Sequence, residues 1–176
     1  QSPTLNGNLL EMRDCIFINN TATKSYGGAL YVETSKELLI TDCFFDGNTA
    51  GGVGGALYID KEVGETTITD CKIARNKARE AGAVYIKGSN SKIDVDSLIF
   101  SENKASYNSP NLLILHCGDA PINIKNSKFD FTKIIGQSQI IIQNSENRKS
   151  EETIHFIGCC FTHQGDIIDE IPTHVE

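Results

Sequence analysis

The chain has 176 residues and a formal net charge of −7, with 39% hydrophobic and 22% charged residues. This composition can supply a folded core and is unlike that of disordered chains. No apolar run approaches the ~20 residues that a membrane-spanning helix needs. The acidic balance, without a basic stripe, argues against a nucleic-acid site and a polybasic membrane site.

A repeat of about 28 residues organises the sequence. The segments Asp14–Ala22, Asp42–Ala50 and Asp70–Ala78 align at two steps of 28 residues, and Ser97–Ala105 follows at a step of 27. Degenerate copies occur at Asn126–Phe129 and Gly158–Phe161. We therefore interpret residues 1–176 as one segment of a solenoid, and we expect it to belong to a longer chain or assembly.

Within each copy the apolar residues alternate with period two, which predicts three short strands. The first strand precedes the motif, and its alternating positions are Leu10/Met12, Leu38/Ile40, Thr66/Ile68, Ile93/Val95, Ile122/Ile124 and Ile154/Phe156, all apolar except Thr66. The second strand carries the cysteine and phenylalanine positions of the motif. The third follows a glycine-rich loop and includes Gly27–Val32, Gly54–Ile59 and Ala81–Ile86, with later versions at 113–115 and 140–142.

Three strands per repeat without a helical stretch predict an all-β fold: a right-handed, single-stranded parallel β-helix, a solenoid of the pectin-lyase-like type. We expect about six coils, near residues 9–36, 37–64, 65–91, 92–120, 121–152 and 153–176. A leucine-rich repeat would need a leucine-dense consensus, and an antiparallel sandwich would not keep equivalent residues at one fixed period.

A coil cannot cover its own apolar face, so stacked neighbours must bury the inward side chains. The columns that we expect to point inward are Leu10/Leu38, Met12/Ile40, Cys15/Cys43/Cys71, Phe17/Phe45/Phe100/Phe129/Phe161 and Leu30/Leu57/Val84.

Three of the six cysteines, Cys15, Cys43 and Cys71, form one of these columns, and Cys159 is equivalent. Our hypothesis is that they are buried, reduced thiols acting as small hydrophobic residues. Three in a row leaves one unpaired, and parallel strands in register give poor disulfide geometry. A disulfide between two of them is the alternative, because adjacent coils bring their Cα atoms within reach. Cys117 and Cys160 fall outside the column.

Polar columns follow the same period. The asparagines Asn20, Asn48, Asn76 and Asn103 predict a structural column, because asparagine tolerates left-handed backbone and stacked amides can bond from coil to coil.

The aspartates Asp14, Asp42 and Asp70 would repel one another when stacked. Hydrogen bonds at the corner, a neighbouring lysine or Arg13, or a bound Ca²⁺ would offset this repulsion, and corner bonding is the interpretation that we favour.

Tyr31, Tyr58 and Tyr85 alternate with inward residues and are therefore expected on the outside of the third strands. Stacked, exposed tyrosines would make a flat aromatic strip. The strip either protects the sheet or serves as a docking face for a protein or a sugar. It is the binding face that the sequence best indicates.

Two other types of site, a catalytic site and a zinc site, are less consistent with the sequence. A polysaccharide lyase or glycosidase of the same fold needs carboxylates in specific roles, whereas the acidic column here is as regular as a structural repeat. The zinc-type ligands His116, Cys117, His155, Cys159, Cys160 and His163 contain no CxxC pair.

The repeat resembles that of the chlamydial polymorphic outer-membrane proteins. Phe17-x-x-Asn20, Phe45-x-x-Asn48 and Phe100-x-x-Asn103 match its FxxN half, and Gly27–Leu30 and Gly54–Leu57 match its GGA(I/L/V) half. The third coil departs with Ile73 and Ala81, and the last two coils keep only the phenylalanine. The resemblance implies a β-helical passenger region, an extracellular location and adhesion, and it carries over no catalytic residue.

The sequence thus predicts a non-enzymatic, extracellular or cell-surface β-helix that serves adhesion or structural assembly. We expect no cofactor, no nucleic acid and no membrane insertion of this segment. The expected partner is a protein or the neighbouring coils of a larger assembly, with a glycan as an alternative. Because neither end carries a convincing cap, we also expect further coils or a docked neighbour at the open sheet edges.

Overall fold

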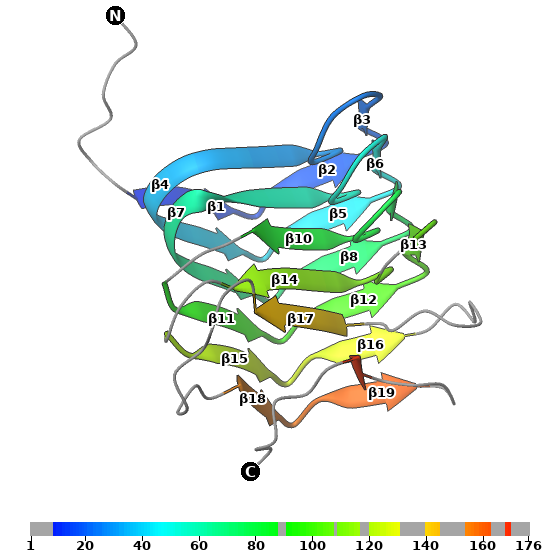
Figure 1. The fold of residues 1–176 in the computed structure, drawn as a ribbon. Helices are drawn as coiled ribbons and strands as arrows, with labels where there is room; N and C mark the ends of the chain where they lie inside the picture. The colour runs from blue at the N-terminus through cyan, green and yellow to red at the C-terminus, as the bar shows by residue number, and fades with distance from the viewer. Residues whose placement is uncertain are drawn as a thin grey trace, which may run out of the picture.

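The computed structural model describes residues 9–87, 91–107, 109–116, 120–130, 140–144, 154–162 and 168–169. All regular elements in these ranges are β-strands, and every pairing between named strands is parallel. The coils stack one above another, with the first coil and the last coil at opposite ends of the molecule (Figure 1). No described segment forms a helix long and apolar enough to cross a membrane.

Three parallel sheets run along the stack. The ten-stranded sheet contains β1 (Leu9–Arg13), β4 (Leu30–Thr41), β7 (Leu57–Thr69), β10 (Val84–Lys87), β11 (Ile93–Asp96), β14 (Leu112–His116), β15 (Ile122–Lys125), β17 (Ile140–Asn144), β18 (Ile154–Ile157) and β20 (Ile168–Asp169). The six-stranded sheet contains β2 (Ile16–Ile18), β5 (Phe44–Asp46), β8 (Lys72–Ala74), β12 (Ile99–Ser101), β16 (Lys128–Asp130) and β19 (Cys160–Thr162). The four-stranded sheet contains β3 (Thr21–Ala22), β6 (Thr49–Ala50), β9 (Lys77–Ala78) and β13 (Lys104–Ala105).

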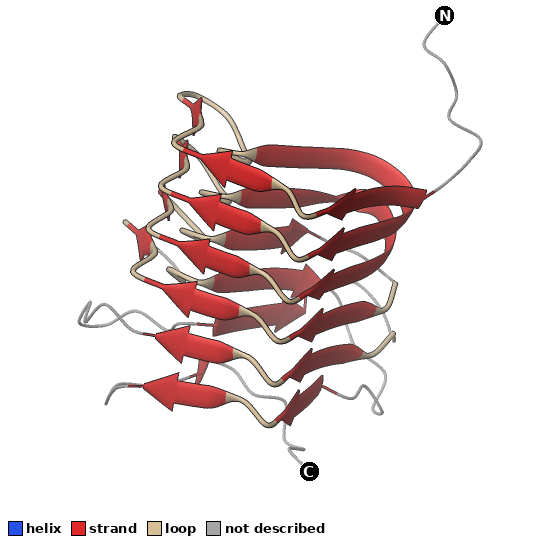
Figure 2. Cartoon of the chain, turned by 180° about the vertical axis from the view of Figure 1, so that it is seen from behind, coloured by secondary structure: helices blue, strands red, loops and turns tan. Residues whose placement is uncertain are grey.

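The predicted parallel solenoid is confirmed, and the number of coils depends on the sheet that is followed. The six-stranded sheet forms six rungs, which Figure 2 shows from behind. The smallest sheet has only four strands in the described part of the chain. About four turns are therefore complete, rather than six.

The strands differ from the expected three per coil in two ways. In the second and third rungs the strand after the glycine-rich loop continues without a break into the strand before the next motif, which gives β4 and β7 their lengths of 12 and 13 residues. Both strands bend, with an irregular register between Val32 and Thr34. The two-residue strands of the smallest sheet were not predicted, since two residues are too few to show an alternation.

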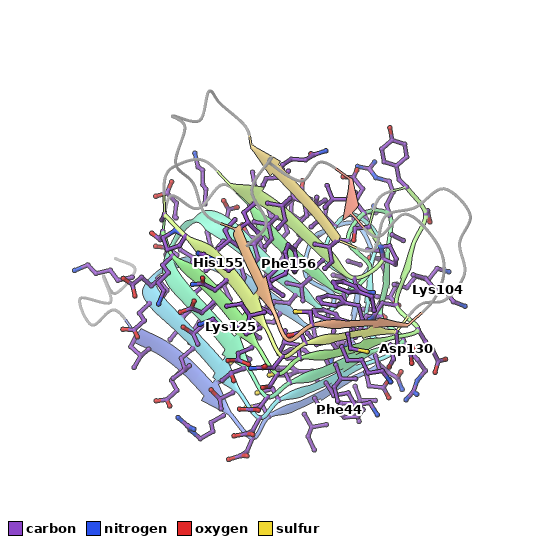
Figure 3. All side chains as sticks on the ribbon, turned by 90° about the horizontal axis from the view of Figure 1, so that it is seen from below. Phe44, Lys104, Lys125, Asp130, His155 and Phe156 are labelled. Carbon is purple, nitrogen blue, oxygen red and sulfur yellow. The ribbon has the colours of Figure 1, made fainter. Side chains whose placement is uncertain are left out.

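The core lies inside the enclosed column. Figure 3 looks along the axis and shows side chains filling the space within the sheets, with Phe156 directed into it. Phe45, Phe100 and Phe129 are fully buried, and the rings of Phe100 and Phe129 stack at 4.9 Å between centroids. Ile73 takes the phenylalanine position in the third coil and is also fully buried.

Residues of the first coil are less buried than the columns predict. Leu38 is fully buried, whereas its partner Leu10 is 38% exposed, and Phe17 is only half-buried. The reason is position: β1 and β2 are edge strands, so among the described residues no coil covers their outer side.

The left-handed corner positions belong to the aspartates rather than to the asparagines. Asp14, Asp42 and Asp70 have φ values of 52–53°, and Ser97 and Asn126 continue this column. A second left-handed column directly precedes the asparagines and consists of Asn19, Gly47, Arg75 and Glu102. Short polar residues and glycine tolerate this conformation best.

Candidate binding surface

The tyrosines occupy one register column on the ten-stranded sheet. Tyr31, Tyr58 and Tyr85 are paired across β4, β7 and β10, and their ring centroids lie 5.1 and 5.2 Å apart. Their neighbours in sequence, such as Leu57 and Ile59, face the main core, so the rings point outward as expected. Leu113 and Ile141 continue the column on β14 and β17.

The expectation that all three rings are exposed is wrong. Tyr31 is 43% exposed, but Tyr58 and Tyr85 are 3% and 8% exposed. They belong to a second apolar cluster outside the main core, which contains Val53, Tyr58, Ala81, Tyr85, Leu113 and Ile141. Val53 and Ala81, which lie in the loops before the third strands, belong to this cluster and so help to bury Tyr58 and Tyr85.

An exposed tyrosine that the sequence analysis did not single out completes the surface. Tyr26 is 47% exposed, and its ring stacks on Tyr58 at 4.8 Å between centroids. It lies in the loop before Gly27, and the residues of this loop do not share a period with the tyrosine column. The variable loops themselves stack, as the hydrogen bonds from Gly52 N to Ser25 O and from Arg79 N to Gly52 O show.

A carboxylate anchors the rings. The hydroxyl groups of Tyr31 and Tyr58 both donate to Asp60 Oδ2, at 3.3 and 3.5 Å. Burial, followed by the negative charges of Asp60 and Glu33, raises the pKa of Tyr31. Burial and then Glu80 raise the pKa of Tyr85 to about 12. The raised pKa values keep Tyr31 and Tyr85 neutral at neutral pH, among acidic side chains.

The tyrosine surface, defined as Tyr26, Tyr31 and Asp60, thus presents two partly exposed rings beside one carboxylate. Tyr58 supports both rings from below, because it stacks with each of them. Such a surface combines apolar area with hydrogen-bonding groups that are held in place before a ligand arrives.

The asparagine column forms a continuous hydrogen-bonded ladder. Asn48 donates from its backbone N and from Nδ2 to Asn76 Oδ1, both at 2.9 Å, and Asn76 donates in the same way to Asn103 Oδ1. The Nδ2 groups of Asn48, Asn76 and Asn103 also donate to a carbonyl of the preceding coil, as Asn76 does to Phe45 O. Asn48, Asn76 and Asn103 are buried, while Asn20 at the end of the ladder is exposed.

The cysteines have a related arrangement. Cys15, Cys43, Cys71, Cys159 and Cys160 are free thiols, and Cys117 lies outside the described residues. The Sγ of Cys71 donates to Thr69 O at 3.1 Å and accepts the backbone N–H of Cys43 at 3.4 Å. Burial raises the pKa of Cys71 to about 12. Ser127 occupies the same column and makes the equivalent bonds with its hydroxyl, to Lys125 O and from Leu98 N.

The aspartates considered for calcium lie apart from any ligand cluster. Asp14, Asp42 and Asp70 are exposed at their corner, where Asp70 accepts a hydrogen bond from Thr69 Oγ1 at 3.0 Å. In the ranges that the structure describes, no three histidine, cysteine or acidic side chains are grouped as metal ligands would be. Of the zinc-type residues, Cys159 packs against the core and His155 pairs in register with Asn123 on the outer face; Cys117 and His163 are not described.

The comparisons with known proteins agree with this architecture. A family model described as a right-handed β-helix region matches residues 6–163. The chain therefore belongs to the right-handed β-helix family, which also gives the handedness of the coil. Neither the comparison with curated proteins nor that with solved structures finds a match.

Proposed function

We propose that this β-helix is a non-enzymatic surface protein, extracellular or on the cell surface, that serves adhesion or structural assembly through side chains on its outer faces. The observation that carries the proposal is the tyrosine surface, in which Tyr26 and Tyr31 are 47% and 43% exposed and rest on the buried Tyr58. The paired FxxN and GGA motifs support the extracellular location by their resemblance to polymorphic outer-membrane proteins.

Rigid support is what makes this surface suited to binding. A tyrosine has few rotatable bonds, and rings that are stacked before binding lose little conformational freedom when a partner docks. The hydroxyl of Tyr31 and the carboxylate of Asp60 can exchange hydrogen bonds with a polar partner at the rim. A protein surface is the partner that we propose, and a glycan would use the same rings by stacking on them.

The rest of the repeat favours a structural role over a catalytic one. The described asparagine, cysteine and phenylalanine columns are engaged in contacts between coils, as the ladders above show. The carboxyl group of Asp94 is likewise engaged in a contact between coils, since it accepts a hydrogen bond from Asn123. Burial opposes its charge, but hydrogen bonds from Lys92 and Asn123 outweigh burial and lower its pKa. A glycosidase acid needs a raised pKa instead.

The experiment compares the chain with the double variant Tyr26→Ala/Tyr31→Ala on cultured cells, on extracellular-matrix proteins and on a glycan array. We expect the variant to lose about tenfold or more in affinity, as is usual when exposed aromatic anchors are removed. Tyr107→Ala is the matched control, because Tyr107 is 72% exposed in a neighbouring loop and lies outside the tyrosine surface. Equal binding by all three proteins would contradict the proposal.

The enzymatic alternative has its own assay. The protein is incubated with acidic polysaccharides with and without Ca²⁺, and the length of the polysaccharide is measured. We expect the length of the polysaccharide to stay unchanged. Depolymerisation that Asp42→Ala abolishes would instead show that the protein is a carbohydrate-active enzyme.

A further inference from the structure

Three side-chain ladders reach the same edge of the molecule, the first coil. β2 is the edge strand of the six-stranded sheet, and there Phe17 stacks on Phe45 with a centroid distance of 4.8 Å and an interplanar angle of 3°. The asparagine ladder starts at Asn20 and the tyrosine ladder at Tyr31, both in this coil. The second coil lies against one side of the first coil (Figure 1), and it supplies the partner of each ladder, Phe45, Asn48 and Tyr58.

The asparagine ladder defines what is missing at this edge. In the interior, each Oδ1 accepts two hydrogen bonds from the coil before it, as Asn76 Oδ1 does from Asn48 N and Nδ2. Asn20 donates from N and Nδ2 to Asn48 Oδ1, at 3.0 and 2.9 Å. In the part of the chain that the structure describes, no group donates to Asn20 Oδ1 in turn.

The backbone repeats the same asymmetry. Phe44 N donates to Cys15 O, and Lys72 N donates to Cys43 O, one coil earlier in each case. Thr49 N and Lys77 N donate likewise to Asn20 O and Asn48 O. The equivalent donors of the first coil are the N–H groups of Ile16 and Thr21, and a preceding coil would supply their acceptors.

The edge is also apolar. Leu9 and Leu10 are 51% and 38% exposed, and Ile16 and Ile18 are 69% and 49% exposed. Met12, Cys15 and Phe17 are only partly buried, although their equivalents one coil later, Ile40, Cys43 and Phe45, are buried. Natural β-proteins normally cover or protect a strand edge that carries apolar surface.

We propose that the first-coil edge, defined by β1, β2 and β3 with Leu10, Phe17 and Asn20, is a docking surface for a further coil of the same repeat. The occupant presents an asparagine to Asn20, an aromatic or aliphatic side chain to Phe17, and parallel strands to β1 and β2. The interface that forms is a continuation of those already present between successive coils of the described stack.

A second copy of this chain fits the edge less well than a repeat coil does. The described asparagine ladder ends at Asn103, whose Nδ2 donates to Asn111 within the same coil region. The last described rung, β18 and β19, carries Phe161 over Phe129 but no described asparagine partner for Asn20. Copies also share a net charge of −7, which opposes their stacking.

The experiment adds one coil to the whole protein. A duplicate of residues 37–64 is joined to Leu9 in place of residues 1–8, and the junction keeps the register because Leu9 and Glu65 both pair with Glu37. Amide hydrogen exchange is measured at Ile16 and Thr21. We expect exchange there to slow by about a hundredfold, because edge amides become part of a ladder. Unchanged exchange at both amides would overturn the proposal.

Two controls separate the components of the proposal. The same extension carrying Asn20→Leu removes the Oδ1 that would accept the backbone N–H of the added Asn48, as Asn76 Oδ1 accepts that of Asn48. Exchange at the added Asn48 amide is expected to stay fast while Ile16 stays protected; equal protection of both amides would overturn the role given to Asn20. The unextended protein is followed by sedimentation velocity over a wide concentration range. It is expected to remain monomeric, and stacking with protection of Ile16 would show that a second copy is the occupant.

Discussion

At the scale of single residues, the asparagines are the most heavily used side chains of the repeat. Asn76 accepts two hydrogen bonds at Oδ1, donates from Nδ2 to Phe45 O and to Asn103 Oδ1, and is fully buried. A buried amide with this many partners ties three coils together. Its removal leaves several buried polar groups without a partner, and each such group loses the free energy of its hydration without gaining a hydrogen bond.

We therefore predict that Asn76→Ala lowers the free energy of unfolding by about 3 kcal/mol or more, since each stranded polar group costs roughly 1–3 kcal/mol. Urea unfolding followed by circular dichroism measures the change. Asn20→Ala is the matched control at the exposed end of the same ladder, and we expect it to cost less than about 1 kcal/mol. Similar losses for the two variants would show that the ladder is not the source of stability.

The buried tyrosines predict a weakness in alkali. Burial raises the pKa of Tyr85 to about 12 and the pKa of Tyr58 further, whereas an unfolded tyrosine titrates near ~10. Above pH ~10 the unfolded chain loses protons that the folded chain retains, so the unfolding free energy falls as pH rises, by about 1.4 kcal/mol per pH unit and proton. Below pH ~10 these two tyrosines do not change the unfolding free energy with pH.

Urea unfolding between pH 9 and 12, together with tyrosinate absorbance, tests this prediction. The variant Tyr58→Phe/Tyr85→Phe lacks the two ionisable groups and should keep a flatter profile in that range. An identical pH dependence in the variant would assign the alkaline loss to other groups.

At the scale of elements, the glycine-rich loop is where neighbouring coils come closest. A Cβ on Gly55 would lie 2.0 Å from Gly82 O and 2.7 Å from Lys77 N, both of which are backbone atoms. Gly28 has the same environment one coil earlier, against Gly55 O at 2.1 Å. The glycine is therefore required by the spacing of the coils, and not by an unusual φ angle.

We predict that Gly55→Ala destabilises the protein by more than about 3 kcal/mol or prevents folding, because backbone atoms of two coils would have to separate. Gly47→Asn is the matched control. Gly47 has φ 65°, but Asn19, Arg75 and Glu102 hold the same left-handed column, and the only near neighbour of its Cβ is the flexible Asn19 side chain. Thermal unfolding should separate the two variants clearly, and comparable melting temperatures would contradict the steric argument.

The sequence predicts the elements to different degrees, for physical reasons. The alternation around Leu38/Ile40 and the spacing of Phe45 predict strands that stack in parallel, because side-chain direction repeats every two residues. The burial of Tyr58 could not be predicted in this way. It depends on the path of the loops that carry Tyr26 and Val53, and neither residue shares a period with the column.

Position within the stack is another property that a repeat does not encode. Leu10 and Leu38 occupy equivalent places in the sequence pattern, yet one is 38% exposed and the other fully buried. The difference lies in whether a coil covers each of them, which is a fact about the assembly and not about the motif.

At the scale of the whole molecule, contacts run mainly between adjacent coils. Each interior strand pairs with its equivalents one coil before and one coil after, and the side-chain ladders follow the same rule. Stability should then behave as a sum over coils and their interfaces. We therefore expect a solenoid of this kind to tolerate the loss of a whole coil, because the two coils that become neighbours present matching surfaces.

We predict that deletion of residues 37–64 leaves a folded β-helix. The junction joins Lys36 to Glu65, and β1 then faces Glu65–Thr69 in the register that it now has with Glu37–Thr41. Tyr31 comes to lie on Tyr85, and Asn20 on Asn76. The strand signal in circular dichroism should persist, with a urea m-value lower by about one sixth, since m scales with the surface exposed on unfolding.

Deletion of residues 37–50 removes half a coil and should abolish cooperative unfolding, because it offsets every ladder below the junction. If the half-coil deletion unfolded as cooperatively as the full-coil deletion, register between coils would not be the organising constraint of this protein.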